Sequence, residues 1–123
     1  MTSCVDSDTS LDFFVNAALG RKAFDFVVLD LRKLTSIADY FVICSGRSNR
    51  QVSAIAEFIH LTLKEQGLKP LFIEGLEQGH WVILDYGYVM IHVFYEPTRE
   101  FYDLEGLWSD ADRVKIKSTV NQT

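Results

Sequence analysis

The sequence predicts a single α/β domain in which helices flank a mixed, five-stranded sheet. The chain has 123 residues, the length of one domain, and 48% of them are hydrophobic, enough for one core without metal or disulfide staples. Runs rich in β-branched and aromatic residues indicate strands, and apolar residues spaced three and four apart indicate helices. The expected element order is α-β-β-α-β-β-β-α, without internal repeats.

An amphipathic helix is expected first. Its apolar residues recur at helical spacing: Leu11, Phe14, Val15, Ala18 and Leu19. Thr9 or Ser10 can cap its N-terminus, and Gly20 can end it. Residues 1–10 lack apolar periodicity and are predicted to form a disordered N-terminal tail.

Two strands and a longer helix follow. Residues 26–31 and 40–44 are predicted to be largely buried strands. Ser48 and Gln51 form the S-x-x-Q pattern of a capping box, and Gly67 can stop the helix. The apolar stripe of this helix is the clearest in the chain: Val52, Ile55, Ala56, Ile59 and Leu63.

Three further strands are expected. A strand over residues 70–74 should pair in parallel with the strand before the helix, because a strand-helix-strand run with a long crossover normally does so. Residues 81–85 and 88–94 flank a Tyr-Gly turn and predict a hairpin. Alternation along its second arm separates two faces: Val89, Ile91 and Val93 on one, Met90, His92 and Phe94 on the other.

The end of the chain predicts one short helix from Pro97 to Trp108. Gly106 should weaken it by about 1 kcal/mol relative to alanine. Apolar periodicity is lost after Trp108, so residues 109–123 are expected to fray as a C-terminal tail. The folded domain is therefore predicted over residues 11–108.

Charge and cysteine usage limit the functions that fit. The net charge of −5 disfavours a protein whose main task is to neutralise phosphates, so contact with RNA should be secondary and a basic protein surface is a more natural partner. No apolar run is long enough to span a membrane, and the N-terminus resembles neither a secretory signal nor a presequence. Cys4 and Cys44 fit no C-x-x-C spacing, which argues against a zinc site and against a redox-active pair. A cytoplasmic location is predicted.

A nucleotide site is one alternative. Ser45 and Gly46 end a strand just before a helix, where backbone N–H groups could bind a phosphate. Nucleotidyl transfer also needs paired carboxylates that hold two metal ions, and the strand after this helix offers Glu74 alone. The sequence therefore favours a turn and a helix cap over a nucleotide-binding site.

Other catalytic combinations also lack support. Ser45, Asp85 and His92 are the residue types of a hydrolase triad, but no G-x-S-x-G elbow accompanies them. Cys44 lies in an apolar strand, which should raise the pKa of its thiol, and the histidines lack metal-ligand spacing. We therefore expect no catalytic residue, no metal and no cofactor.

The C-terminal half is rich in aromatic residues interleaved with charges. These side chains either supplement the core or form the centre of an interface, where Trp, Tyr and Arg are enriched. Composition leaves both readings open.

Several motifs in order resemble the ribosomal silencing factor family, also called the Iojap-like family. The motifs are LTSIADYF at 34–41, CSGRSNRQV at 44–52, Glu74-Gly75, Trp81, LDYG at 84–87, HVF at 92–94, Arg99, FYDLE at 101–105 and Leu107-Trp108. The sequence departs from the family pattern at Tyr88, where an acidic residue is common, and at Gly106, where a larger residue is usual.

The resemblance implies a nucleotidyltransferase-like fold without the catalytic carboxylates, and no enzyme activity. It implies binding to protein fourteen of the large ribosomal subunit, on the face that meets the small subunit, so that joining of the subunits and translation are hindered. It also implies a homodimer and a role in large-subunit assembly. The predicted partner-binding residues are Asp39, Trp81, Asp85, His92, Phe94, Arg99, Tyr102 and Trp108.

Overall fold

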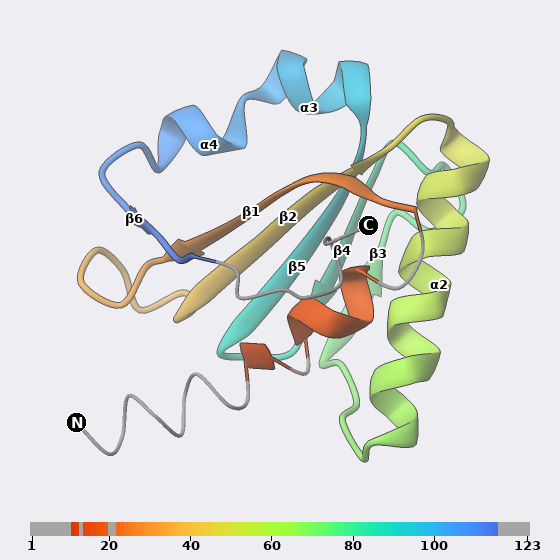
Figure 1. The fold of residues 1–123 in the computed structure, drawn as a ribbon, viewed down its shortest axis with the longest axis horizontal. Helices are drawn as coiled ribbons and strands as arrows, with labels where there is room; N and C mark the ends of the chain where they lie inside the picture. The colour runs from red at the N-terminus through yellow and green to blue at the C-terminus, as the bar shows by residue number, and fades with distance from the viewer. Residues whose placement is uncertain (1–10, 13, 20–21, 116–123) are drawn as a thin grey trace.

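A computed structural model describes residues 11–12, 14–19 and 22–115. It has a six-stranded mixed sheet in the order β3-β4-β5-β2-β1-β6, with helices on both faces (Figure 1). Residues 11–12 and 14–19 are helical and form the N-terminal helical segment. The other elements are β1 (Phe24–Asp30), β2 (Tyr40–Gly46), α2 (Asn49–Glu65), β3 (Phe72–Glu74), β4 (Trp81–Asp85), β5 (Val89–Tyr95), α3 (Glu96–Tyr102), α4 (Leu104–Leu107) and β6 (Asp112–Arg113).

The centre of the sheet is a parallel pair of β2 and β5, and β4 and β5 form the predicted antiparallel hairpin. The expected parallel pairing of β2 with the strand after α2 is wrong. Because β1 and β5 already bond both edges of β2, the short β3 pairs antiparallel with β4 at the edge of the sheet. β3 still runs in the same direction as β2, with β5 and β4 between them.

α2 begins and is buried as its sequence predicts. Ser48 Oγ accepts a hydrogen bond from the Gln51 N–H at 3.1 Å, while Gln51 Oε1 accepts from the Arg47 N–H, one residue earlier than in the standard capping box. The buried residues of α2 are those of the predicted stripe. The predicted caps Thr9, Ser10 and Gly20 lie outside the described residues.

Each face of the sheet carries its own core. The N-terminal helical segment and α2 cover one face, and α3 and α4 cross the other (Figure 1). The side chains of β5 divide between the two faces as predicted: Val89, Ile91 and Val93 belong to the first core, and Phe94 with the half-buried Met90 to the second. β1 is only partly buried, contrary to expectation, because β6 covers no more than its last two residues.

The C-terminal region differs from prediction in two ways. The expected single helix is two, because Asp103 takes a left-handed conformation (φ +48°) between α3 and α4 and accepts a hydrogen bond from the Gly106 N–H at 3.2 Å. The region after Trp108 does not fray at once, since Asp112 and Arg113 add a sixth strand beside the end of β1. A two-residue strand carries no periodicity that a sequence could reveal. None of the described helices is long and apolar enough to cross a membrane.

Candidate partner-binding surface

Four of the predicted partner-binding residues form one aromatic cluster on the α3 side of the sheet. The indole Nε1–H of Trp81 donates a hydrogen bond to His92 Nδ1 at 3.0 Å. The Trp81 ring stacks on Phe94, with 4.8 Å between ring centroids, and lies 5.2 Å from the ring of Tyr102. The hairpin register produces this cluster, because Trp81 in β4 lies directly opposite Phe94 in β5.

Trp108 joins the same face through Phe41 of β2. The Phe41 ring lies 4.5 Å from the ring of His92 and 6.0 Å from that of Trp108. Phe41 therefore connects the end of α4 to the cluster around Trp81. The sequence placed Phe41 in a buried strand and gave no signal of this bridging position.

Burial divides the cluster into a support and a surface. His92 and Phe94 are buried, Trp81 and Trp108 are half-buried, and the side chain of Tyr102 is 52% exposed. Burial also lowers the pKa of His92 to about 3, so its ring is neutral at pH 7 and the nitrogen that accepts from Trp81 carries no proton. His92 and Phe94 therefore support Trp81 from the sheet side.

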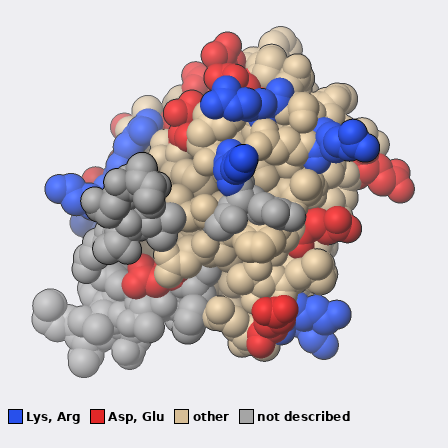
Figure 2. All heavy atoms as spheres, turned by 45° about the vertical axis from the view of Figure 1, so that its right-hand side comes forward, with Lys and Arg blue, Asp and Glu red and all other residues tan. Residues whose placement is uncertain are grey.

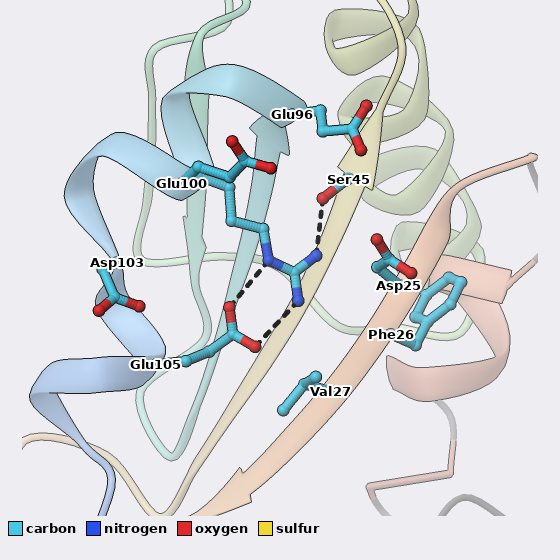
Figure 3. Close-up of a pocket in the computed structure, with 9 residues that line it drawn as sticks. Asp25, Phe26, Val27, Ser45, Glu96, Glu100, Asp103 and Glu105 are labelled. Atoms are coloured by element: carbon cyan, nitrogen blue, oxygen red, sulfur yellow. Dashed lines mark hydrogen bonds and ion pairs between the residues drawn. The ribbon is translucent and has the colours of Figure 1, made fainter.

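Arg99 is buried beneath α3. Its Nε and Nη2 donate to the Glu105 carboxylate at 2.9 and 3.1 Å, and its Nη1 donates to Ser45 Oγ at 2.6 Å (Figure 3). The Arg99 guanidinium lowers the pKa of Glu105, against the opposing effect of partial burial. Arg99 thus links β2, α3 and α4 from inside.

The hollow beside Arg99 is unsuited to a nucleotide. Its volume is about 400 Å³, and acidic side chains from several elements surround it: Asp25, Glu96, Glu100, Asp103 and Glu105 (Figure 3). The Ser45 hydroxyl, which a phosphate would need free, accepts a hydrogen bond from Arg99, whose charge is already paired with Glu105. Repulsion from this set of carboxylates disfavours a polyphosphate.

The structure does not bring Ser45, Asp85 and His92 together as a hydrolase triad, and it offers no reactive thiol at Cys44. Ser45 Oγ bonds to Arg99, and the Asp85 carboxylate accepts from the Gly87 N–H in the β4–β5 turn. Burial raises the pKa of the Cys44 thiol to about 12, as the sequence leads one to expect. Within the described part of the chain, no three His, Cys, Asp or Glu side chains come close enough to hold a metal ion.

Asp39 and Asp85 lie apart from the aromatic cluster. Asp39 directly precedes β2, and its N–H donates to the carbonyl oxygen of Tyr88 at 2.7 Å, just after the β4–β5 turn. Asp85 ends β4 opposite Met90, at the end of the hairpin away from Trp81. Both residues therefore lie at the end of the sheet near the β4–β5 turn, away from Trp81 and the residues around it.

Two exposed apolar residues were missed by the sequence-based site. Phe101 on α3 is 79% exposed and Leu107 on α4 is 75% exposed. Phe101 packs edge-on against Tyr102 and lines a groove of about 500 Å³ that also includes Trp81 and Pro97. We call Trp81, Phe101 and Tyr102 the aromatic surface. Its exposure could not be read from the sequence, because it depends on how α3 packs against the sheet.

The face seen in Figure 2 carries charged side chains of both signs. Figure 2 shows lysine and arginine side chains interspersed with aspartate and glutamate, with no broad basic area on the face in view. This face offers no extended track for a phosphate backbone, in agreement with the acidic composition of the chain.

The fold and the site define a small α/β domain whose mixed sheet carries an exposed aromatic surface beside a buried arginine. The model of the family described as "ribosomal silencing factor during starvation" matches residues 5–123, and the chain belongs to this family. The family expected from the sequence motifs is thereby confirmed.

Individual relatives agree. The chain is 40% identical to the ribosomal silencing factor RsfS of Halalkalibacterium halodurans over 111 residues, which cover 90% of this chain and 95% of the relative. The crystal structure of a Bacillus halodurans protein matches with a TM-score of 0.79 and 38% identity, over 89% of this chain and 99% of that one. A mouse protein named "Mitochondrial assembly of ribosomal large subunit protein 1" is 32% identical over 80% of this chain and 45% of its own length.

Proposed function

We propose that this protein acts in the cytoplasm, binds the large ribosomal subunit through ribosomal protein fourteen and sterically blocks joining with the small subunit, which represses translation. Membership of the silencing factor family supports the silencing role. The exposed aromatic surface carries the binding part of the proposal, because Trp, Tyr and Phe in this density are typical of the centre of a protein interface. The name of the mouse relative supports a further role in large-subunit assembly.

The proposed contact residues are the aromatic surface and Trp108, with Trp81 supported from below by His92 and Phe94. The groove beside Trp81 offers a concave apolar site for a side chain of the partner. Packing in such a groove is the geometry in which a few residues supply most of the binding free energy. Protein contacts should dominate, and contact with ribosomal RNA should be secondary.

Asp39 and Asp85 are proposed for a separate contact at the opposite end of the hairpin. Both carboxylates lie near the β4–β5 turn, where they can attract basic side chains. This contact is either with the ribosomal partner or with the second protomer of the homodimer that the family resemblance implies.

Sedimentation with purified large subunits tests the surface. Phe101→Ala combined with Tyr102→Ala should weaken binding by at least about tenfold, because both side chains are exposed and their loss removes contacts without opening the core. Leu61→Ala is the matched control, since Leu61 is a similarly exposed apolar residue on α2, across the sheet. Equal binding of the double variant and the control would show that the aromatic surface is misplaced.

A further inference from the structure

α3 is attached to the sheet in an unusual way for a short helix. Among its seven residues, the buried one is Arg99, while Phe101 and Tyr102 face outward. A helix of two turns is not stable alone, and most helices gain their stability from a packed apolar face. The position of α3 must therefore depend strongly on the contacts of one charged side chain.

Those contacts join three elements. The Arg99 guanidinium reaches Ser45 at the end of β2 and both carboxylate oxygens of Glu105 in α4 (Figure 3). Between Arg99 and Glu105 the chain passes through the left-handed Asp103, where α3 ends and α4 begins. The guanidinium thus fixes α3 against the sheet and fixes the angle between α3 and α4. We call Ser45, Arg99 and Glu105 the arginine clasp.

The aromatic surface depends on where α3 lies. Trp81 is held from the sheet side by His92 and Phe94, but Tyr102 reaches Trp81 only from the last residue of α3. The Phe101 ring in turn lies at 89° to that of Tyr102, with 5.0 Å between centroids. A shift of α3 would separate these rings and change the shape of the groove.

We propose that Arg99 is a positioning residue for partner binding: the arginine clasp holds α3 and α4 so that Phe101 and Tyr102 are arranged for the partner before it arrives. Arg99 is 9% exposed and its donors point at Ser45 and Glu105, so it does not touch the partner. Prearrangement lowers the ordering cost of binding. The inference rests on the proposed partner role of the aromatic surface.

The first test uses the free protein. In Arg99→Lys and in Glu105→Gln, the NMR signals of the Tyr102 ring and the Trp81 indole N–H should shift, because lysine cannot reproduce the two-pronged contact and glutamine lacks the charge. Arg113→Gln is the matched control: Arg113 also approaches Glu105, at 3.9 Å, but its side chain is 63% exposed. Unchanged Tyr102 and Trp81 signals in both clasp variants would overturn the clasp, whatever the partner is.

The second test is a double-mutant cycle on binding to the large subunit, with circular dichroism to verify that each variant is folded. Arg99→Lys and Glu105→Gln should each weaken binding by about tenfold, and the double variant by about the same factor, because one interaction is lost in all three. Arg113→Gln should bind as the wild type does.

The alternatives give different results. If Arg99→Lys weakened binding to the large subunit and Glu105→Gln left the affinity unchanged, Arg99 would contact the partner itself. If the loss of affinity in the double variant equalled the product of the two single losses, the two residues would make independent contacts. Each of these two results would overturn the positioning role. If the wild type did not bind the large subunit at all, the proposed function would fail, while the NMR test of the clasp would still stand on its own.

Discussion

The indole N–H of Trp81 donates to Nδ1 of His92 across 3.0 Å, which places a half-buried ring over a buried acceptor. The bond orients the indole and keeps its polar edge satisfied while the rest of the ring faces the groove. Both residues were predicted to contact a partner. In the structure, His92 fixes the orientation of the Trp81 ring.

This environment predicts an acid sensitivity due to His92. Its pKa falls from an ordinary 6.5 to about 3 on folding, so below pH 6.5 the unfolded chain binds a proton that the folded protein does not. The free energy of unfolding should therefore decrease as pH falls from 6.5, at up to about 1.4 kcal/mol per pH unit, until the folded-state pKa is reached.

His92→Gln isolates this contribution, because glutamine can accept from Trp81 but does not titrate. The free energy of unfolding is measured with urea between about pH 5 and 6.5, because carboxylates protonate below this interval. The pH dependence in that interval should be smaller in the variant than in the wild type. Identical slopes would show that His92 is not kept neutral by burial.

Gly106→Ala should lower the free energy of unfolding, whereas this substitution in a helix usually raises it. A Cβ on Gly106 would overlap the Asp103 carboxylate that caps α4. We expect a loss of about 1 kcal/mol in the free energy of unfolding, in place of the usual gain. Asp103→Gly tolerates the left-handed conformation and removes the carboxylate, so in that background Gly106→Ala should no longer be destabilising. Thermal unfolding of the four proteins measures this.

The protein should neither hydrolyse nor transfer nucleotides. The Ser45 hydroxyl is bonded to Arg99, and carboxylates line the adjacent hollow. Incubation with magnesium and each nucleoside triphosphate, followed by chromatography, should show no turnover above buffer. Turnover that disappears in Ser45→Ala would establish the enzyme alternative.

Added salt should weaken the binding of the protein to the large ribosomal subunit only moderately. A complex held by phosphate contacts loses orders of magnitude in affinity between low and moderate salt, whereas a net charge of −5 disfavours such contacts. Some loss is expected because attraction to a basic protein is screened. Affinity measured from about 50 to 200 mM salt checks this, and tight binding to naked ribosomal RNA would contradict it.

Periodicity in the sequence was sufficient for the elements with strong patterns. The stripe of α2, its Ser48 cap and the β4–β5 hairpin are all confirmed, because local spacing and capping determine them. The pairing of β3 with β4 was not predictable in this way. It depends on which strand edges remain free after β1 and β5 have bonded to β2.

The sequence indicated which residues make up the candidate surface, but it did not predict which of them are buried and which are exposed. The register of β4 and β5 brings Trp81, His92 and Phe94 together, and a period of two suffices to place them on one face. The burial of Arg99 depends on its contacts with Ser45 in β2 and Glu105 in α4, which local spacing does not reveal. The break between α3 and α4 lies at Asp103 in the left-handed conformation, which aspartate adopts more often than most residues but which a single aspartate does not predict.

An order-of-addition experiment with separated subunits tests the central proposal most directly. A bound domain about 30 Å across is large enough to obstruct an interface made at atomic distances. Added to large subunits before small subunits, the protein should reduce the whole-ribosome peak in a density gradient, by about half when its free concentration equals its dissociation constant. Added after joining, it should leave that peak largely intact. An unchanged whole-ribosome peak with the large subunit saturated would contradict silencing by occlusion.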